Sequence, residues 1–359
     1  EKGGYKYLGD VFVADAKSYY ENGAPEGEWT FDAAGNLVYT GDDLVYEGNF
    51  SNAVLDFGGY GQTTIVHELG HTLGLSHPGA YNGAGATTYT DQAEYAQDSE
   101  QYTIMSYWSA SETGARIVDW GTFFFNNEQT PLLHDIYVAQ QKYGAEMDTR
   151  TGDTTYGFNA NVDKDVYDFS INDFPYLTIW DAGGEDTLDM SGFNSSVVIN
   201  LNAGEFSSGG QRAVTPEFME EAYADRNAAI ELTYGIEDFY LPYDQGTIDS
   251  VIGRYEGLNE LDIYFDWGHE GVFSNQYENI SIAYGVTIEN AVGGDFRDII
   301  VANEVDNTLT GNGGADVFIF QHGGHDTITD FVSGEDTIDL SWLGSSADIA
   351  IEAGEMTAH

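Results

Sequence analysis

Residues 293–329 carry a nine-residue repeat, which constrains the fold more than any other feature of the chain. The blocks read GGDFRDIIV from residue 293, ANEVDNTLT from 302 and GNGGADVFI from 311, and then, after a slip of one residue, QHGGHDTIT from 321. The sixth and eighth places hold one polar and one apolar residue in each block, namely Asp298 and Ile300, Asn307 and Leu309, Asp316 and Phe318, and Asp326 and Ile328. This matches the nonapeptide GGxGxDxUx, which winds into a parallel β-roll with the apolar residue in the core and Ca²⁺ between stacked turns.

The repeat predicts several structural calcium ions. Phe296 and Val305 stand where the pattern has a glycine, and a single block alone would fit a solvated Gly/Asp turn better than a calcium site. Several blocks in near register favour calcium. Asp330, Asp336 and Asp339, just beyond the repeat, fit either calcium ligands or turn residues. The ligands predicted within the repeat are Gly293, Asp298, Gly311, Gly313, Asp316 and Asp326.

The chain divides into two domains of different character near Met147. We expect an α+β multidomain protein, with a mixed sheet and helices in residues 1–147 and an all-β domain in residues 148–359. Short strands separated by Gly, Asp and Asn, as in YDFSI, YLTIWDAGGEDTLDMSGF and VVINLNAGEF, support the second domain. Residues 209–279 differ in composition and are predicted to be an insertion that includes a helix in PEFMEEAYADRNAAIELTY.

The stretch HELGHTLGLSH, residues 67–77, predicts a metal centre in the first domain. His67 and His71 are four residues apart, so on a helix both imidazoles reach one ion. Glu68 lies about 100° around the helix axis from His67, where it can meet a water molecule on that ion without binding the ion itself. Gly74 can end the helix in the left-handed conformation and bring His77 to the same ion.

Three imidazoles without a thiolate suit zinc, and three protein ligands leave one coordination position open for water. This pattern favours one catalytic zinc ion rather than a closed structural site. The zinc helix is expected around TTIVHELGHTLGL, a second helix over residues 131–147, and a hairpin in residues 29–40 that turns near residues 34–36.

Composition restricts the partners of the protein. The 61 acidic and 11 basic residues give a formal charge of −50, which excludes nucleic acid and anionic membrane surfaces as partners and favours cations. No cysteine is present, so bound calcium is the expected cross-link. No run of 18 apolar residues exists in the sequence, so no segment is expected to cross a membrane.

The zinc motif continues into a family resemblance. HELGHTLGLSHPG together with TIMSYW, residues 103–108, resembles the metzincin metalloproteases, and among them the serralysins, which show Pro78 after the third histidine. The segments YAQDSEQYTIMSYW, TRTGDTTYGFNAN and SIAYGVTIENAVGG are similar to serralysins in the same order. The resemblance implies a secreted zinc endopeptidase in which Tyr107 is a further zinc ligand that stabilises the oxyanion, Glu68 is the general base and Met105 supports the site.

The resemblance also implies two calcium sites outside the repeat. One would use main-chain oxygens with two carboxylates, from Arg150, Gly152, Thr154, Gly183, Asp181 and Asp186. The other would use Gly184, Asp186, Thr287 and Glu289.

Further expectations follow from the same family. They are protein or peptide substrates, with a proteinaceous inhibitor as a further partner, a monomeric state, no membrane insertion, and secretion from a bacterium by a type I system. Less sequence precedes the zinc helix than in serralysins, and the family's apolar C-terminal signal has no counterpart in IEAGEMTAH, so we expect a trimmed chain.

Two alternative functions remain open. One is a calcium-binding surface or structural protein with an inert zinc site, and the other is a zinc hydrolase that acts on something other than peptides. The other histidines are interpreted as ordinary ones: His134, His322 and His325 as surface or satisfied residues, and His269 and His359 as residues with no identified partner.

Overall fold

A computed structural model of the chain describes the zinc-motif region and most of the second half of the sequence. His322, His359 and the C-terminal segment IEAGEMTAH lie outside the described residues. The described residues are 29–31, 37–39, 58, 60–79, 88–117, 127–162, 164–210, 215–217, 219–220, 224, 244–259, 268–269, 271–272, 274, 276–321 and 323–343.

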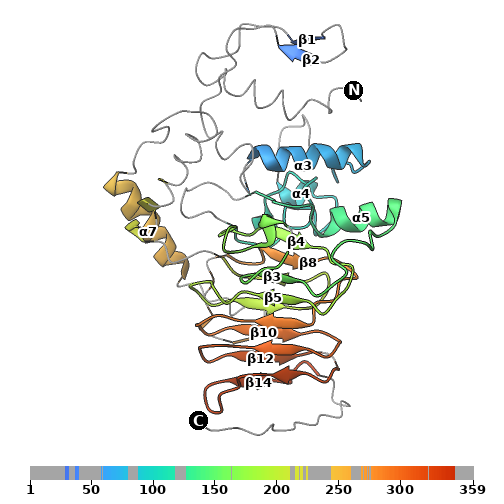
Figure 1. Cartoon of the computed structure of the whole chain (residues 1–359). Coiled ribbons are helices and arrows are strands. Elements are labelled where there is room, and N and C mark those ends of the chain that lie inside the picture. Colours follow the sequence, from blue (N-terminus) through green and yellow to red (C-terminus); the bar gives the residue numbers. More distant parts are fainter. Residues whose placement is uncertain are drawn as a thin grey trace.

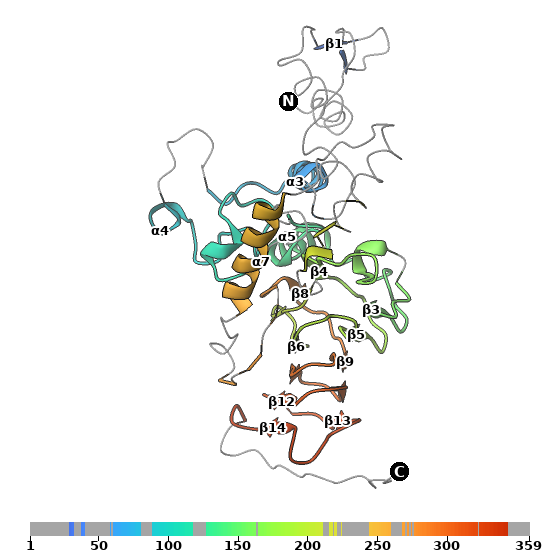
Figure 2. The same cartoon turned by 90° about the vertical axis from the view of Figure 1, so that its left-hand side faces the viewer.

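The helices within residues 60–143 lie above the stack of short strands in the views of Figures 1 and 2, and the helix of residues 245–259 runs beside the upper strands. The zinc helix and the second helix are confirmed, although the structure makes the second one shorter than residues 131–147. The helices are α3 (Tyr60–Thr72), α4 (Tyr89–Gln92), α5 (Leu133–Tyr143) and α7 (Gln245–Asn259), with 3-10 turns at Ala110–Glu112 and Asp165–Tyr167.

The strands are short, with two to four residues each. β1 (Trp29–Phe31) and β2 (Leu37–Tyr39) pair antiparallel, which confirms the hairpin of residues 29–40. The others are β3 (Thr155–Gly157), β4 (Leu177–Ile179), β5 (Thr187–Asp189), β6 (Val198–Asn200), β7 (Phe206–Ser207), β8 (Ile280–Ile282), β9 (Asn290–Val292), β10 (Ile299–Ala302), β11 (Thr308–Thr310), β12 (Val317–Phe320), β13 (Thr327–Ile328) and β14 (Thr337–Asp339).

Two parallel sheets dominate the second half of the chain, with strand orders β14-β12-β10-β6 and β13-β11-β9-β5-β3, and β4, β8 and β7 form a small third sheet. From β9 to β14 successive strands alternate between the two parallel sheets. Each nine-residue block therefore supplies one strand, and a strand pairs with the strand two blocks later. Ile299 pairs with Val317, which is two blocks of nine further along the chain. Thr308 pairs with Thr327, and the extra residue absorbs the slip in the repeat.

The core lies where the two parallel sheets contact each other. The predicted eighth-place residues Ile300, Leu309 and Phe318 are fully buried in one cluster, and Ile328 packs against it. Because side chains alternate across a strand, their neighbours point to the opposite face. The expectation of helices together with parallel strands is confirmed, and so is the core position of the repeat's apolar residues.

Residues of the predicted insertion cover the outer face of the sheet β14-β12-β10-β6. Val272 and Tyr277 pack against Ile299, Val301 and Val317 of that face. The helix expected in residues 216–234 lies largely outside the described residues, whereas α7 is a helix that the sequence analysis did not predict.

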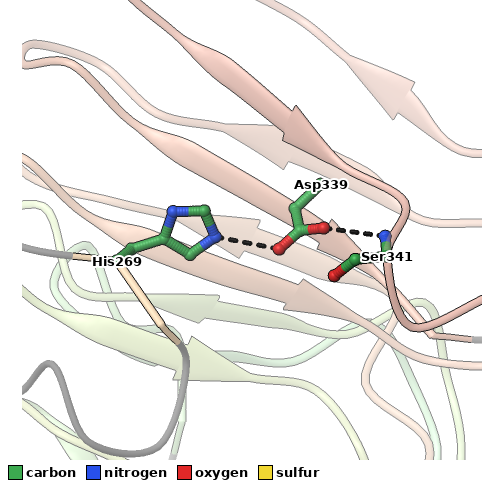
Figure 3. Close-up of polar contacts among 3 residues, drawn as sticks. All are labelled: His269, Asp339 and Ser341. Carbon is green, nitrogen blue, oxygen red and sulfur yellow. Dashed lines mark hydrogen bonds and ion pairs between the residues drawn. The ribbon is translucent and has the colours of Figure 1, made fainter.

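His269 has a partner that the sequence did not identify. Its Nε2 lies 2.9 Å from Oδ2 of Asp339 at the end of β14, and Asp339 Oδ1 accepts a hydrogen bond from the Ser341 N–H at 2.8 Å (Figure 3). Burial acts to raise the pKa of Asp339, but the Ser341 hydrogen bonds and His269 outweigh it and hold that pKa below its usual range. His269 of the insertion thus contacts β14 through a residue that lies 70 positions further along the chain.

The segment YDFSI, residues 167–171, was wrongly expected to be a strand. Asp168 ends a 3-10 turn, and its Oδ1 accepts hydrogen bonds from both the N–H and the hydroxyl of Ser170, at 2.9 and 2.5 Å. Such local side-chain bonds favour a turn over a strand.

Among the described residues, no helix has the length and apolar character needed to cross a membrane.

Candidate metal centre

The three histidines of the zinc motif meet at the end of helix α3. His67 and His71 lie one turn apart on the helix, which ends at Thr72. Gly74 follows with φ of +79°, a conformation that favours glycine and turns the chain back. As a result, Nε2 of His77 lies 3.0 Å from Nε2 of His67 and 3.1 Å from Nε2 of His71. The prediction that these side chains share one site agrees with this geometry.

Hydrogen bonds fix which nitrogen of two imidazoles carries the proton. His67 Nδ1 lies 2.6 Å from the carbonyl oxygen of Ile104, and His71 Nδ1 lies 2.9 Å from that of Leu75. A carbonyl oxygen can only accept, so both Nδ1 atoms donate and both neutral rings present a bare lone pair on Nε2.

The spacing of these lone pairs suits one zinc ion. Bare lone pairs about 3 Å apart repel each other unless a cation or a proton lies between them. Two nitrogens bound to one tetrahedral zinc at about 2.0–2.1 Å would lie roughly 3.3 Å apart, close to the spacing of the Nε2 atoms. Burial is the main cause that lowers the pKa of both His67 and His77, which keeps these rings neutral as a metal ligand must be.

Glu68 supplies a carboxylate beside the histidines. Its Oε2 is buried and has no hydrogen-bond partner among the residues that the structure describes. An unpartnered buried carboxylate oxygen is costly in a folded protein unless a ligand or water uses it. The atom is therefore suited to accept a proton from a molecule bound at the site.

Tyr107 lies beside the histidine rings, and Met105 packs against Gly70 of helix α3. The Tyr107 ring centroid lies 4.6 Å from that of His77 and 5.9 Å from that of His67, and the side chain is half exposed. Met105 is buried, and its sulfur lies only 2.9 Å from the place where a Cβ on Gly70 would be. The structure thus places the Tyr107 ring beside the histidines and Met105 against the helix that carries two of them.

The contact between Gly70 and Met105 leads to a testable prediction. We expect Gly70→Ala to lower the free energy of unfolding by up to about 2 kcal/mol, because a crowding cost of about 1–3 kcal/mol opposes a helix-propensity gain of about 1 kcal/mol. Gly253→Ala in α7 is the control, since no atom lies within 4 Å of a Cβ added there, and it should increase stability. Denaturant unfolding of both variants measures the difference. Equal gains in stability would show that Met105 does not pack tightly under the helix.

The first predicted calcium site lies where strands β3 and β5 begin. Asp186 Oδ1 accepts a hydrogen bond from the Thr154 N–H at 2.7 Å, while Asp186 Oδ2 is buried and has no hydrogen-bond partner in the described part of the chain. A Cβ on Gly184 would lie 2.6 Å from the Gly152 carbonyl oxygen and 2.7 Å from Asp186 Oδ1. Only glycine allows these oxygens to approach so closely.

Two further carboxylates surround Asp186. Asp181 accepts hydrogen bonds from the Tyr156 hydroxyl at 2.6 Å and the Gly183 N–H at 2.7 Å, and Glu289 Oε2 accepts one from the Asp186 N–H at 2.7 Å. Burial, together with repulsion from Asp181 and Glu289, raises the pKa of Asp186 to about 7. A cation bound here would relieve that repulsion.

Two residues carried over from the family, Arg150 and Thr287, are predicted to contribute main-chain oxygens. Arg150 has a φ of 51°, its guanidinium lies over the Tyr167 ring at 4.5 Å, and its side chain donates a hydrogen bond to the Trp180 carbonyl. Thr287 is exposed and lies two residues before Glu289. Their main-chain oxygens therefore remain predicted calcium ligands.

A carboxylate column runs along the sheet β14-β12-β10-β6, formed by the residues directly before three of its strands, Asp298, Asp316 and Asp336. The Val197 N–H donates to Asp298 Oδ1 at 2.8 Å, the Asp298 N–H to Asp316 Oδ1 at 2.9 Å, and the Asp316 N–H to Asp336 Oδ1 at 3.0 Å. Each carboxylate is thus held at a fixed place in successive turns of the chain.

Glycines leave room around the carboxylate column. A Cβ on Gly293 would lie 2.5 Å from Asp298 Oδ2, and one on Gly311 would lie 2.3 Å from Asp316 Oδ2. Burial raises the pKa of Asp298 well above its usual range, and burial together with repulsion from Asp336 raises that of Asp316 to about 7. Buried, adjacent carboxylates with oxygen-lined space around them are typical of calcium sites.

The remaining predicted ligands lie in two places. Asp326 Oδ1 accepts a hydrogen bond from the Asn307 N–H at 3.0 Å, directly before β13 in the other parallel sheet. The Gly313 N–H donates to the Gly294 carbonyl at 3.0 Å, and a Cβ on Gly313 would meet Asp295.

Of the three aspartates beyond the repeat whose role was left open, Asp330, Asp336 and Asp339, Asp336 continues the carboxylate column. Asp316 lies 18 residues after Asp298, and Asp336 lies 20 residues after Asp316. The step of two nine-residue blocks was the available signal, but the slips in the repeat shift Asp336 out of register. The strand pairing of Val317 with Thr337 restores the register in the structure.

Comparisons with known proteins give the following matches. Residues 145–214 and 269–354 match the family model described as peptidase M10 serralysin C terminal, and residues 45–122 match metallo-peptidase family M12B reprolysin-like. The chain is 37% identical over 290 residues to serralysin from Proteus mirabilis, which covers 78% of this chain and 45% of that protein. It is 36% identical over 316 residues to metalloprotease AprA from Pseudomonas entomophila, covering 81% of this chain and 51% of the relative.

Metallopeptidase AprA from Pseudomonas marginalis is 35% identical over 334 residues, which covers 86% of this chain and 56% of that protein. The chain thus spans about half the length of the curated relatives it matches.

Proposed function

Because residues 145–214 and 269–354 belong to the serralysin C-terminal family and the chain is similar to serralysins over most of its length, we propose that the protein is a zinc endopeptidase that hydrolyses peptide bonds in proteins. The observation that carries the proposal is the convergence of three Nε2 atoms, from His67, His71 and His77, beside Glu68 and Tyr107. No cysteine or serine nucleophile is required for this chemistry.

The three Nε2 atoms would hold one zinc ion, and the Tyr107 hydroxyl would be a further ligand. Zinc, when bound, polarises a substrate carbonyl and lowers the pKa of a water molecule that it binds from 15.7 to about 7. The Ile104 and Leu75 carbonyls keep Nδ1 of His67 and His71 protonated, which leaves their Nε2 lone pairs for the metal.

Glu68 acts as the general base and then as the general acid. Its Oε2 accepts a proton from the attacking water molecule, which makes the water nucleophilic toward the scissile carbonyl carbon. The same oxygen then delivers the proton to the amine nitrogen as the peptide bond breaks. The buried Oε2 without a hydrogen-bond partner in the described residues supports this role.

Tyr107 stabilises the charge that develops on the substrate. Its hydroxyl donates a hydrogen bond to the carbonyl oxygen as that oxygen becomes negative, an interaction that is stronger in the transition state than in the ground state. The half-exposed side chain beside His77 can move toward a substrate. Met105, packed under Gly70, keeps the floor of the site in place.

The second half of the chain would be a calcium-stabilised β-roll. We assign residues 1–147 to a metzincin catalytic domain and residues 148–359 to the β-roll domain, with an insertion at about residues 209–279. Alternation of successive strands between two parallel sheets and the carboxylate column support this assignment. The proposed calcium ligands are those named above, with Asp336 added.

The protein would act outside a bacterial cell, as a monomer, after secretion by a type I system. Sites built from main-chain oxygens and carboxylates bind calcium at the concentrations found outside cells, roughly 10⁻⁴–10⁻³ M. Proteins and peptides would be its substrates, a proteinaceous inhibitor a further partner, and the charge of −50 argues against nucleic acid.

Metal analysis joined to a proteolysis assay tests this function. We expect one zinc ion per chain, casein hydrolysis that stops on addition of a zinc chelator, and recovery of activity when zinc is restored. Full zinc content without hydrolysis of any peptide would instead favour a structural protein with an inert site. Hydrolysis of a non-peptide substrate in a panel would favour a different zinc hydrolase.

A further inference from the structure

We infer that Asp135 is a positioning residue for His67, acting through the main chain of Ile104. Asp135 lies in the first turn of α5, outside the zinc motif. Its carboxylate binds Thr103, Ile104 and Leu132 rather than a histidine. The inference rests on the proposed zinc site and names a residue on which that site depends.

The Asp135 carboxylate is a buried acceptor of three hydrogen bonds. Its Oδ1 accepts the Thr103 hydroxyl at 2.6 Å, and its Oδ2 accepts the N–H groups of Ile104 and Leu132, both at 2.9 Å. The side chain is only 3% exposed. Burial raises the pKa of Asp135 to about 6, so the ionised form, which can only accept, prevails at neutral pH.

The same residue that Asp135 holds also orients His67. The Ile104 N–H donates to Asp135, and the Ile104 carbonyl accepts the Nδ1 proton of His67 at 2.6 Å. Thr103 strengthens this connection, because its hydroxyl oxygen accepts the Met105 N–H at 3.1 Å while donating to Asp135. One carboxylate therefore fixes the turn that sets both the tautomer of His67 and the place of Met105.

Loss of the carboxylate would leave these donors without acceptors inside the protein. An unsatisfied buried donor is unfavourable, so the turn would move to find other partners. The Ile104 carbonyl would then leave His67 Nδ1, and the ring could place its proton on Nε2, where it cannot bind a metal. Asn at this position keeps one oxygen for the two N–H donors and loses only the charge and the accepted Thr103 bond.

Asp135 also caps the N-terminus of α5 through the Leu132 N–H, so a purely structural role has to be separated from positioning. Asp98 offers the matched control. Asp98 is also fully buried. Its carboxylate accepts hydrogen bonds from the Ser106 hydroxyl at 2.8 Å and the Glu94 N–H at 3.0 Å. Ser106 follows Met105 in the chain, whereas Asp135 binds the two residues before Met105. Removing it damages buried hydrogen bonds without removing the acceptor of the Ile104 N–H.

The test compares Asp135→Ala, Asp135→Asn and Asp98→Ala in the full chain. Zinc affinity is measured by competition with a chelator, the His67 ring protons by ¹⁵N-histidine NMR of the zinc-loaded protein, and the melting temperature by calorimetry. We expect Asp135→Ala to weaken zinc binding about 10- to 100-fold and to shift or broaden the His67 Nδ1–H signal. The zinc affinity of Asp135→Asn should lie between those of Asp135→Ala and the wild type. Asp98→Ala should lower the melting temperature but leave the zinc affinity near that of the wild type.

Unchanged zinc affinity and an unchanged His67 signal in the Asp135 variants would overturn the inference, whatever their melting temperatures. If Asp135→Ala does not fold, Asp135→Asn decides by the same two measurements. A wild-type protein that binds no zinc would instead refute the proposed function, and this inference with it. A wild type that binds zinc beside Asp135 variants that bind it equally well would refute the inference alone.

Discussion

Replacing Glu68 with Gln is expected to lower kcat/KM for casein hydrolysis by about 10²–10⁴-fold while zinc content stays at the wild-type level. Gln has nearly the same shape but no basic oxygen in place of Oε2, so it can neither take the proton from water nor return it to the leaving amine. The buried Oε2, without a hydrogen-bond partner among the described residues, has no structural bond to lose on substitution. Stability should therefore change little.

The control for Glu68→Gln is His71→Ala, which removes one of the three converging Nε2 atoms. That variant should lose both zinc and activity, whereas Glu68→Gln should lose activity alone. Zinc content by elemental analysis, melting temperature and initial rates separate the two outcomes. A Glu68→Gln protein that still hydrolyses casein at the wild-type rate would show that another group acts as the base.

Removal of calcium is expected to have the largest effect on stability. In the carboxylate column Asp298 and Asp316 are buried and the Asp298 N–H donates to Asp316 Oδ1, so negative charge on both side chains is unfavourable unless a cation lies beside them. Each calcium ion present at 100 times its dissociation constant would stabilise the fold by about 2.7 kcal/mol. We expect EGTA to lower the melting temperature strongly and to increase self-digestion of residues in the repeat.

The pH dependence of the metal-free protein provides a second arm of the same prediction. Burial raises the pKa of Asp316 and of Asp186 to about 7, above the value of an unfolded aspartate near 3.9. A raised pKa means that the folded state binds the proton more tightly, so stability is fully present below pH ~4 and is lost as the pH rises toward 7. In EGTA the melting temperature should therefore fall over this window, and saturating calcium should remove the fall.

Asp316→Asn distinguishes calcium binding from simple burial of charge. Asn keeps an oxygen that can accept the Asp298 N–H, which Asp316 Oδ1 accepts at 2.9 Å, but it carries no charge. We expect the variant to be at least as stable as the wild type in EGTA and less stable than the wild type in saturating calcium. Equal melting curves of the wild type with and without calcium, after proven metal loss, would contradict the proposed role of the column.

Local patterns allowed the parts of the site with fixed spacing to be predicted. His67, His71 and His77 depend on one helix and one glycine turn, and the observed φ of Gly74 agrees with that expectation. Asp298 and Asp316 follow from the repeat. Asp135, in contrast, lies 68 residues after His67, and no local rule connects an aspartate at the start of α5 to a histidine on α3.

The errors have the same cause. His269 pairs with Asp339, 70 residues further along the chain, and α7 lies in the segment that precedes His269. The segment around Asp168 has the residues of a strand, but hydrogen bonds from Ser170 to its carboxylate close a turn. Asp336 lies 20 residues after Asp316, two more than the repeat predicts, so its match to Asp316 became clear only from the pairing of Val317 with Thr337.

The sequence by itself determined the ligand types, their spacing within α3 and the nine-residue period, because these depend on helical geometry, one glycine and the alternation of side chains along a strand. Only the tertiary structure decided which distant groups complete them. Ile104, Asp135 and Asp336 enter through hydrogen bonds between segments that the fold brings together, and such contacts depend on packing rather than on separation along the chain.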